Sequence, residues 1–176
     1  MGEDRGFSIR DAGRSQVSEL LNHLYGQHHR LCTTPAGQVT LVLSRDREID
    51  LIELEQLCDA VGWSRRPIRR VRRALQNSLL VVGLWRHDPR LPKLVGFARC
   101  TGDGIVDATI WDVAVHPLYQ GAGLGKQLMV FVLDALRGQQ VERVSLFADP
   151  GVVDFYSAQG WELEPNQRRC AFWYAP

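Results

Sequence analysis

The segment from Gln120 to Lys126 is the part of the chain whose residue types and spacing best fit chemistry. It reads Gln-Gly-Ala-Gly-Leu-Gly-Lys and lies between a β-branched apolar stretch and an apolar helical pattern. Gly121, Gly123 and Gly125 have no Cβ, so several backbone N–H groups can converge on an anion at the positive N-terminal end of the following helix. Gln120 adds an amide donor and Lys126 a positive charge. The segment is predicted to bind phosphate groups.

Two other kinds of phosphate site fit this glycine-rich segment less well. A dinucleotide site needs G-x-G-x-x-G after the first strand of a repeated βαβ unit, whereas the spacing here is G-x-G-x-G in the second half of the chain. A P-loop needs Ser or Thr after its lysine, and Lys126 is followed by Gln127. A tight turn that only packs a helix against a strand stays open.

The elements that must position this segment can be predicted from hydrophobic periodicity. Leu51, Leu54, Leu57, Cys58 and Val61 have helical spacing, with Asp50 placed to cap that helix and Gly62 to end it. A second helix is expected after Pro67, with Ile68, Val71, Ala74 and Leu75 on its apolar stripe. Helices are also expected over 124–138 and 152–158. Strands are expected at 39–43, 79–85, 94–100, 105–115, 141–147, 161–163 and 170–174.

This order of elements predicts an α/β (α+β) fold with a mixed sheet of six or seven strands and about four helices. Short Gly/Asp turns between the early strands indicate antiparallel hairpins. The later strand, helix, strand order indicates a right-handed parallel crossover. Residues 1–37 have little apolar patterning and are interpreted as a weakly ordered extension, so the domain is expected to span residues 38–176.

Composition limits the classes of function. The 176 residues suit one ordinary domain, and a net charge of +1 gives no global attraction to nucleic acid or to an anionic membrane. Four scattered cysteines, with no close pair and no histidine at metal-ligand spacing, argue against a metal site and favour a reducing compartment. The N-terminus has no apolar signal region, and no stretch is apolar enough to span a bilayer. A cytoplasmic protein is expected, or a stromal one if it is a processed plant protein.

The pattern Q-x-x-G-x-G at Gln120, Gly123 and Gly125, after the V-A-V-H-P strand end, resembles the acetyl-CoA signature of the GNAT acetyltransferases. The resemblance covers about residues 38–176. The sequences WSRRP, LLVVGLW, GFAR, ATIWDVAV, LFADPGVVDFY and the terminal FWY are similar to a plastid and cyanobacterial group. Some members of that group are described as serotonin (arylalkylamine) N-acetyltransferases, and others acetylate protein lysines and N-termini.

The resemblance implies acetyl-CoA as cosubstrate and assigns roles to individual residues. It points to Asp112 as the base that removes the amine's proton and to Tyr156 as the acid that protonates the leaving thiolate, with Asp149 as a further active-site acid. The backbone N–H near Val115 is implied to stabilise the thioester oxygen. The residues implied to contact the cofactor are Val113, Val115, Gln120, Gly121, Ala122, Gly123, Leu124, Gly125, Lys126, Asp149 and Tyr156.

Structural alternatives remain for these side chains. Asp112 could only satisfy backbone groups, Tyr156 could be a core aromatic residue, and Asp149 could belong to an ordinary turn. Trp63 and Trp111 are candidates to stack on an indole ring, but either could be packed in the core. Six arginines between Arg65 and Arg73 could guide an anionic cofactor or an acidic protein substrate, or form a solvated helix face.

The sequence thus favours direct acetyl transfer to a primary amine, most simply a small arylalkylamine such as serotonin, in a monomer or homodimer without nucleic-acid or membrane partners. A protein lysine or N-terminal amine is the alternative acceptor. A non-catalytic CoA-binding module is the alternative from another class, and retention of both Asp112 and Tyr156 argues against it.

Overall fold

The computed structural model describes residues 29–34, 37–45, 47–87, 92–168 and 171. The chain forms two compact units, Met1–Ser145 and Leu146–Pro176. The elements of the first unit are the strands β1 (His29–Thr34), β2 (Gly37–Ser44), β3 (Leu80–Arg86), β4 (Lys93–Gly102) and β5 (Asp107–Val115), and the helices α2 (Leu51–Ala60), α3 (Ile68–Gln76) and α4 (Leu124–Gly138), with a 3-10 turn η2 (Pro117–Tyr119). The strand β6 (Arg143–Leu146) follows α4.

The strands form one six-stranded sheet in chain order, β1 to β6. Each of the first four neighbouring pairs is antiparallel. Residue numbers increase in the same direction along β6 and along the segment of β5 that it contacts. The Arg143 N–H donates to the carbonyl of Val106, just before β5, and the Ser145 hydroxyl lies 3.0 Å from that of Thr109 in β5. This is parallel pairing, so the predicted change from hairpins to a parallel crossover through α4 is confirmed.

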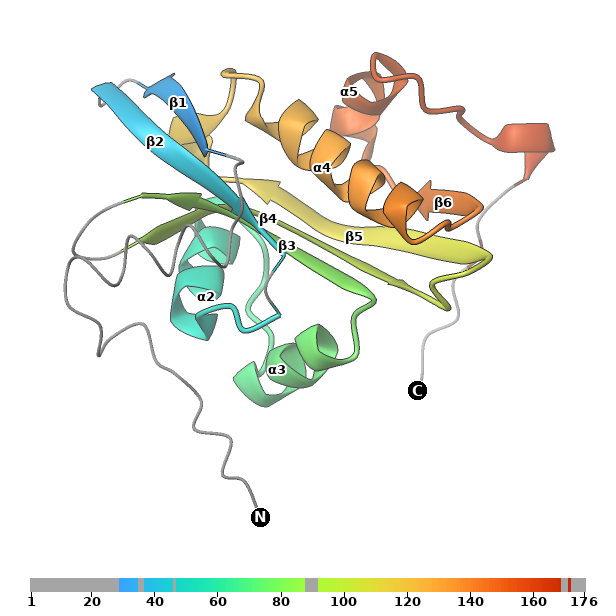
Figure 1. The fold of residues 1–176 in the computed structure, drawn as a ribbon, viewed down its shortest axis with the longest axis horizontal. Helices are drawn as coiled ribbons and strands as arrows, with labels where there is room; N and C mark the ends of the chain where they lie inside the picture. The colour runs from blue at the N-terminus through green and yellow to red at the C-terminus, as the bar shows by residue number, and fades with distance from the viewer. Residues whose placement is uncertain (1–28, 35–36, 46, 88–91, 169–170, 172–176) are drawn as a thin grey trace. The chain divides into compact units, whose positions relative to one another are not determined.

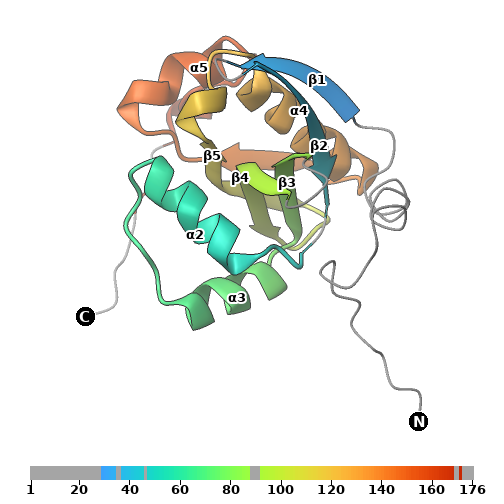
Figure 2. The same ribbon diagram turned by 90° about the vertical axis from the view of Figure 1, so that its left-hand side faces the viewer.

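Helices cover both faces of the sheet in the first unit. Figures 1 and 2 show α2 and α3 on one face and α4 on the other. Under α2 and α3 lies a core of Ile49, Leu54, Leu57, Leu75, Val81, Leu94, Phe97 and Ala114. A second cluster joins the sheet to the start of α4 and contains Leu41, Leu84, Val95, Tyr119 and Leu124. The start of β4 and the end of β5 are therefore packed on both faces of the sheet.

The helix boundaries follow from local capping. The Asp50 carboxylate accepts the N–H groups of Ile52 and Glu53, so α2 begins where the sequence predicted. Gly62 follows α2 with φ of 79°, the left-handed conformation that suits a glycine stop. On α3 the expected apolar stripe is only partly correct, because Leu75 is buried and Val71 half-buried whereas Ile68 is exposed.

Three strand predictions need correction. Residues 29–34 pair with β2 throughout, although 1–37 was interpreted as weakly ordered; residues 1–28 lie outside the described residues. The strand expected from Ile105 begins at Asp107. One carboxylate oxygen of Asp103 accepts the N–H groups of residues 105, 106 and 107, which keeps the chain in the turn up to that point. No strand forms at 161–163, which is followed by left-handed Glu164. Most of the strand expected at 170–174 lies outside the described residues.

The second unit contains η3 (Pro150–Val152), α5 (Val153–Ser157) and η4 (Pro165–Gln167). The helix expected at 152–158 is thus present in shorter form. It ends with Trp161 N–H donating to the Tyr156 carbonyl at 3.3 Å. None of the helices among the described residues has the length and apolar character needed to cross a membrane.

Candidate active site

The loop that joins β5 to α4 is held by its own side chains. Gln120 Nε2 donates to the Val115 carbonyl at 2.8 Å, and the Leu118 N–H donates to Nδ1 of His116 at 3.2 Å. Burial, and then the charge of Lys93, lower the pKa of His116, which keeps that nitrogen able to accept. The side-chain amide of Gln120, which the sequence analysis assigned to a phosphate, thus also holds the loop against the end of β5.

The glycines shape an open N-terminus on α4. Gly121 and Gly123 have φ of 77° and 75°, a region where a Cβ is strained, and a Cβ at either would meet no atom within 4 Å. Gly123 is the N-cap and makes no side-chain cap bond, so the first N–H groups of α4 have no side-chain acceptor there. The side chain of Leu124 is buried in the core, and Lys126 is exposed. This space and these donors fit a pyrophosphate.

Asp112 lies at an irregularity between β4 and β5. The register passes from Phe97 opposite Ala114 to Arg99 opposite Trp111, so two residues of β5 face one residue of β4. Asp112 takes φ of 55°, a left-handed conformation that costs a residue with a side chain about 1–2 kcal/mol. The bulge thus aims the Asp112 carboxylate where regular pleating would not.

Two arginines contact the Asp112 carboxylate, and they differ in burial. Nε of Arg99, on β4, lies 2.5 Å from Oδ2, and both side chains are mostly buried, at 17% and 16% exposure. NH1 of Arg66, just before α3, lies 3.2 Å from Oδ1 and 3.4 Å from Oδ2, and its side chain is 64% exposed. Arg99 therefore holds the carboxylate firmly, and Arg66 closes its outer side.

The thiol of Cys58 on α2 belongs to the same neighbourhood. Its pKa is raised by burial first and then by the negative charge of Asp112, whereas Arg66 lowers it. The thiol is therefore neutral near pH 7 and supplies a half-buried, uncharged wall close to the carboxylate.

The two candidate substrate tryptophans have partners in the first unit. Trp111 is half-buried and donates from Nε1 to the Thr101 hydroxyl at 2.9 Å. Trp63 packs against the core beneath α2, and its backbone N–H donates to the Cys58 carbonyl at 2.9 Å. Trp111 neighbours Asp112 in the bulged strand, while Trp63 mainly completes the core.

Tyr156 and Asp149 lie in the second unit. Tyr156 is buried, with its ring edge-on to Phe155 and Trp161 at centroid distances of 5.0 and 6.2 Å. Burial, and then the charge of Asp149, raise the pKa of Tyr156, so its phenol stays protonated at neutral pH. Asp149 immediately precedes η3, and its carbonyl accepts the Val152 N–H.

Sequence reasoning missed Arg99, Arg66 as a partner of Asp112, and the bulge itself. A lone arginine in the otherwise apolar strand Leu94–Cys100 was an available signal, because a charged group among buried neighbours needs a counter-ion. No group of three or more potential metal-binding residues occurs in the part of the chain that the structure describes.

Comparisons with known proteins agree with this geometry. The family model of the Acetyltransferase (GNAT) family matches residues 49–161, more than half of the chain. The chain belongs to the GNAT acetyltransferase family. Its fold resembles that of a solved GNAT family acetyltransferase from Streptococcus pneumoniae, with a TM-score of 0.64 and 25% identity over 77% of this chain and 98% of that one.

Relatives of this GNAT acetyltransferase carry different substrate names. A ycf52-like uncharacterized N-acetyltransferase of Prochlorococcus marinus is 59% identical over 96% of this chain and 93% of its own. The Glycine max protein named histone acetyltransferase TAP1 is 40% identical, over 81% of this chain and 65% of its own. The Oryza sativa protein named serotonin N-acetyltransferase 2, chloroplastic, is 38% identical, over 72% and 63%. The chain is an N-acetyltransferase of the plastid and cyanobacterial group, and family membership makes acetyl-CoA its cosubstrate.

Proposed function

We propose that this acetyltransferase moves the acetyl group of acetyl-CoA to a primary amine that docks at Asp112. The observation that carries the proposal is the carboxylate in the β5 bulge, mostly buried and held by Arg99. A fixed negative charge of this kind attracts an ammonium group and gives its proton a destination. A strained backbone that serves to aim one side chain is typical of functional positions.

The cofactor's pyrophosphate is assigned to the N-terminus of α4. The backbone N–H groups from Gly121 to Lys126 would bind it, and the Lys126 ammonium would add a charge. Val113, Val115 and Ala122 are proposed to line the path of the pantetheine arm. When bound, acetyl-CoA supplies an activated acetyl thioester, whose oxygen the Val115 N–H is proposed to stabilise.

Proton removal is the first task of the side chains. A primary ammonium has a pKa near that of lysine, so deprotonation at neutral pH opposes the reaction by roughly 3 units, or about 4 kcal/mol. Asp112 takes this proton, directly or through one water. The amine nitrogen would then attack the acetyl carbon, so that a C–N bond forms and the C–S bond breaks. The nitrogen loses its second proton in this step, which replaces the proton that Tyr156 gives to the sulfur. Tyr156, whose raised pKa keeps it protonated, donates its proton to the departing sulfur, and Asp149 is proposed to orient the phenol.

A small arylalkylamine such as serotonin is the acceptor we favour. Trp111 presents a half-buried aromatic surface beside Asp112, and a chloroplastic relative is named a serotonin N-acetyltransferase. A protein amine is the second candidate, favoured by the relative named a histone acetyltransferase. Two relatives are named chloroplastic, which supports the stroma of a plant cell, or otherwise the cytoplasm, as the site of action.

Thiol release from acetyl-CoA tests the proposal. Serotonin, tryptamine, spermidine and a lysine peptide are offered separately to the wild type and to Tyr156→Phe, with each acetylated product verified by mass spectrometry. Release with the indole amines, strongly reduced in the variant, is the expected result. Tight acetyl-CoA binding without release from any amine would contradict the proposal and favour a non-catalytic CoA-binding module.

A further inference from the structure

The two arginines on Asp112 cannot have the same role. Arg99 is mostly buried and makes one short contact, so it is a permanent part of the site. Arg66 is 64% exposed and makes two long contacts, 3.2 and 3.4 Å, from a single nitrogen. Exposed pairs of this kind contribute little to stability and exchange readily with water and other ions. Arg66 is therefore a displaceable counter-ion.

The place that Arg66 occupies is the place that an acceptor ammonium needs. Within the described residues, Oδ1 of Asp112 has Arg66 as its hydrogen-bond partner, while Oδ2 is shared with Arg99. A guanidinium and an ammonium are both cationic donors to carboxylate oxygens. An amine that binds Oδ1 of Asp112 competes there with Arg66, and Arg66 leaves more easily if another anion receives it.

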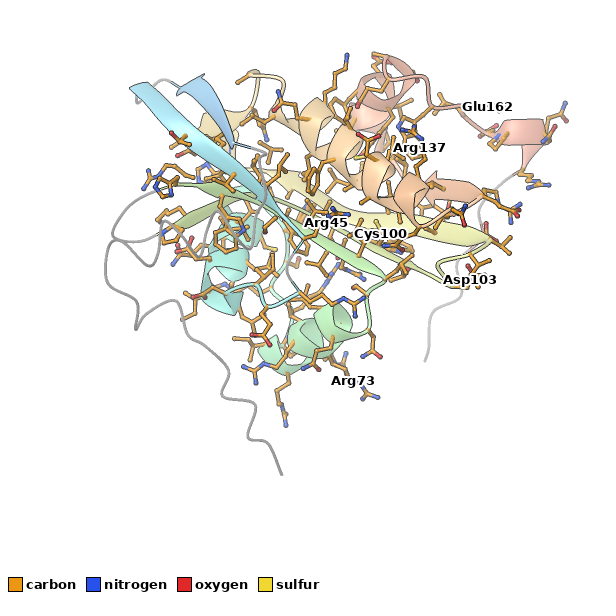
Figure 3. All side chains as sticks on the ribbon, viewed as in Figure 1. Arg45, Arg73, Cys100, Asp103, Arg137 and Glu162 are labelled. Atoms are coloured by element: carbon orange, nitrogen blue, oxygen red, sulfur yellow. The ribbon has the colours of Figure 1, made fainter. Side chains whose placement is uncertain are left out.

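The helix that follows Arg66 is unusually basic. Arg69, Arg70 and Arg73 lie on the half of α3 turned away from its buried residue Leu75, Arg72 lies one turn before Leu75, and α3 contains no acidic residue. All four are exposed, and none has an ion-pair partner among the described residues. Figure 3 shows Arg73 projecting from α3 on the side away from the sheet. We call these four residues and Arg66 the arginine face.

Charge balance makes this concentration informative. The whole chain has a net charge of only +1, so the arginine face is a local feature. The cofactor's phosphates are assigned to α4, which lies on the opposite face of the sheet from α3 (Figure 1). A separate anionic partner would suit the four guanidinium groups of α3, which have no ion-pair partner in the described part of the chain and lie close in sequence to the counter-ion of Asp112.

We infer that the arginine face selects acceptor amines carried on an acidic polypeptide segment. An acidic side chain near the acceptor amine takes over Arg66, which frees Asp112 for the ammonium, and further acidic residues bind Arg69, Arg70, Arg72 and Arg73. The inference rests on the proposed acetyl transfer to a primary amine at Asp112. It adds an acidic peptide to the small amine as a second acceptor class and makes Arg66 a specificity-determining residue.

The test compares acceptors that share one amine. Three peptides carry a single lysine flanked by Asp, Gln or Arg residues, and tryptamine serves as an amine without any anion. Because each exposed charge pair is worth 0.2–1 kcal/mol, two or three pairs should give the Asp-flanked peptide about tenfold higher kcat/KM than the Gln-flanked one. The Arg-flanked peptide should be the poorest substrate, and added salt should reduce the differences.

The variant Arg66→Gln has an effect of opposite sign on the two acceptor classes. For tryptamine, the variant removes the guanidinium that competes for Asp112, so KM should fall about threefold with kcat unchanged. For the Asp-flanked peptide, it removes a positive charge that binds the peptide's acidic residues, so KM should rise about threefold. The double variant Arg69→Gln/Arg70→Gln should weaken only the peptide. Arg137→Gln on α4 is the matched control, since it removes one exposed positive charge on the other side of the sheet (Figure 3).

Several results would overturn the inference. Equal kcat/KM for the Asp- and Gln-flanked peptides in the wild type is one, and a shift of both KM values in the same direction in Arg66→Gln is another. Protection of the arginine face by a short RNA, with no preference among the peptides, would assign it to nucleic acid instead. Acetylation of tryptamine but of no peptide would refute the inference while leaving the proposed function intact, whereas acetylation of no amine would refute both.

Discussion

The ion pair between Arg99 and Asp112 should contribute measurably to folding, whereas the pair between Arg66 and Asp112 should not. Asp112→Asn is the informative change, because asparagine tolerates the left-handed backbone at this bulge and removes only the charge. Hydrogen bonds between charged groups contribute about 1.5–3 kcal/mol, and breaking a fully buried ion pair costs about 3–5 kcal/mol. Because the side chains of Asp112 and Arg99 are 16% and 17% exposed, Asp112→Asn is expected to lower the free energy of unfolding by about 2 kcal/mol.

A double-mutant cycle separates the two arginines. Arg99→Gln, Asp112→Asn and the double variant should give a coupling free energy of about 1–2 kcal/mol, and the same cycle with Arg66→Gln less than about 0.5 kcal/mol. Urea unfolding followed by far-ultraviolet circular dichroism measures each value. With a slope of about 2 kcal/mol per molar urea, Asp112→Asn should lower the midpoint by about 1 M.

The reasoning fails if the two cycles give equal coupling, or if the Arg99 coupling is below about 0.5 kcal/mol. Repeating the cycles in 0.5 M NaCl adds a control. Salt should abolish the small Arg66 coupling and leave most of the Arg99 coupling, because partly buried pairs are screened much less than exposed ones.

Other predictions concern the loop, a histidine and the second unit. Gly123→Ala should destabilise the fold by about 1–2 kcal/mol and weaken acetyl-CoA binding in calorimetry, whereas Gly138→Ala, in helical backbone with open space around it, should not destabilise. The pKa of His116 is lower in the folded protein than in the unfolded chain, so as pH falls through 6.5 the unfolded chain binds the proton first and the free energy of unfolding should fall. His116→Asn should flatten this part of the dependence of the free energy of unfolding on pH. Tyr156→Phe should lower kcat about 100-fold without raising KM for acetyl-CoA, measured by thiol release, and an unchanged kcat would remove Tyr156 from the chemistry.

Much of the fold could be predicted because its signals are local. The helix 124–138 has the predicted bounds, since a glycine in the left-handed conformation precedes it and its apolar residues keep helical spacing. The α2 cap at Asp50 and the antiparallel hairpins likewise depend on a few neighbouring residues. Strand β1 escaped prediction because its pairing with β2 depends on a partner strand and not on its own apolar pattern.

The site was less predictable because it depends on contacts between distant residues. Asp112 was named from its place beside the glycine-rich segment, but a bulge is a mismatch of register with β4 and leaves no mark in the sequence of β5. Arg66 is 46 residues from Asp112, so pattern alone could not pair them. The roles assigned to Asp112, Tyr156 and Asp149 remain predictions that kinetics must test.

The most direct test of the central claim is the turnover of tryptamine by Asp112→Asn, with acetyl-CoA binding measured on the same sample. Binding should stay within about twofold of wild type, because Asp112 is not among the residues assigned to the cofactor, while kcat/KM should fall at least about 100-fold. Wild-type turnover in a variant that binds acetyl-CoA normally would show that the carboxylate of Asp112 neither docks the amine nor accepts its proton.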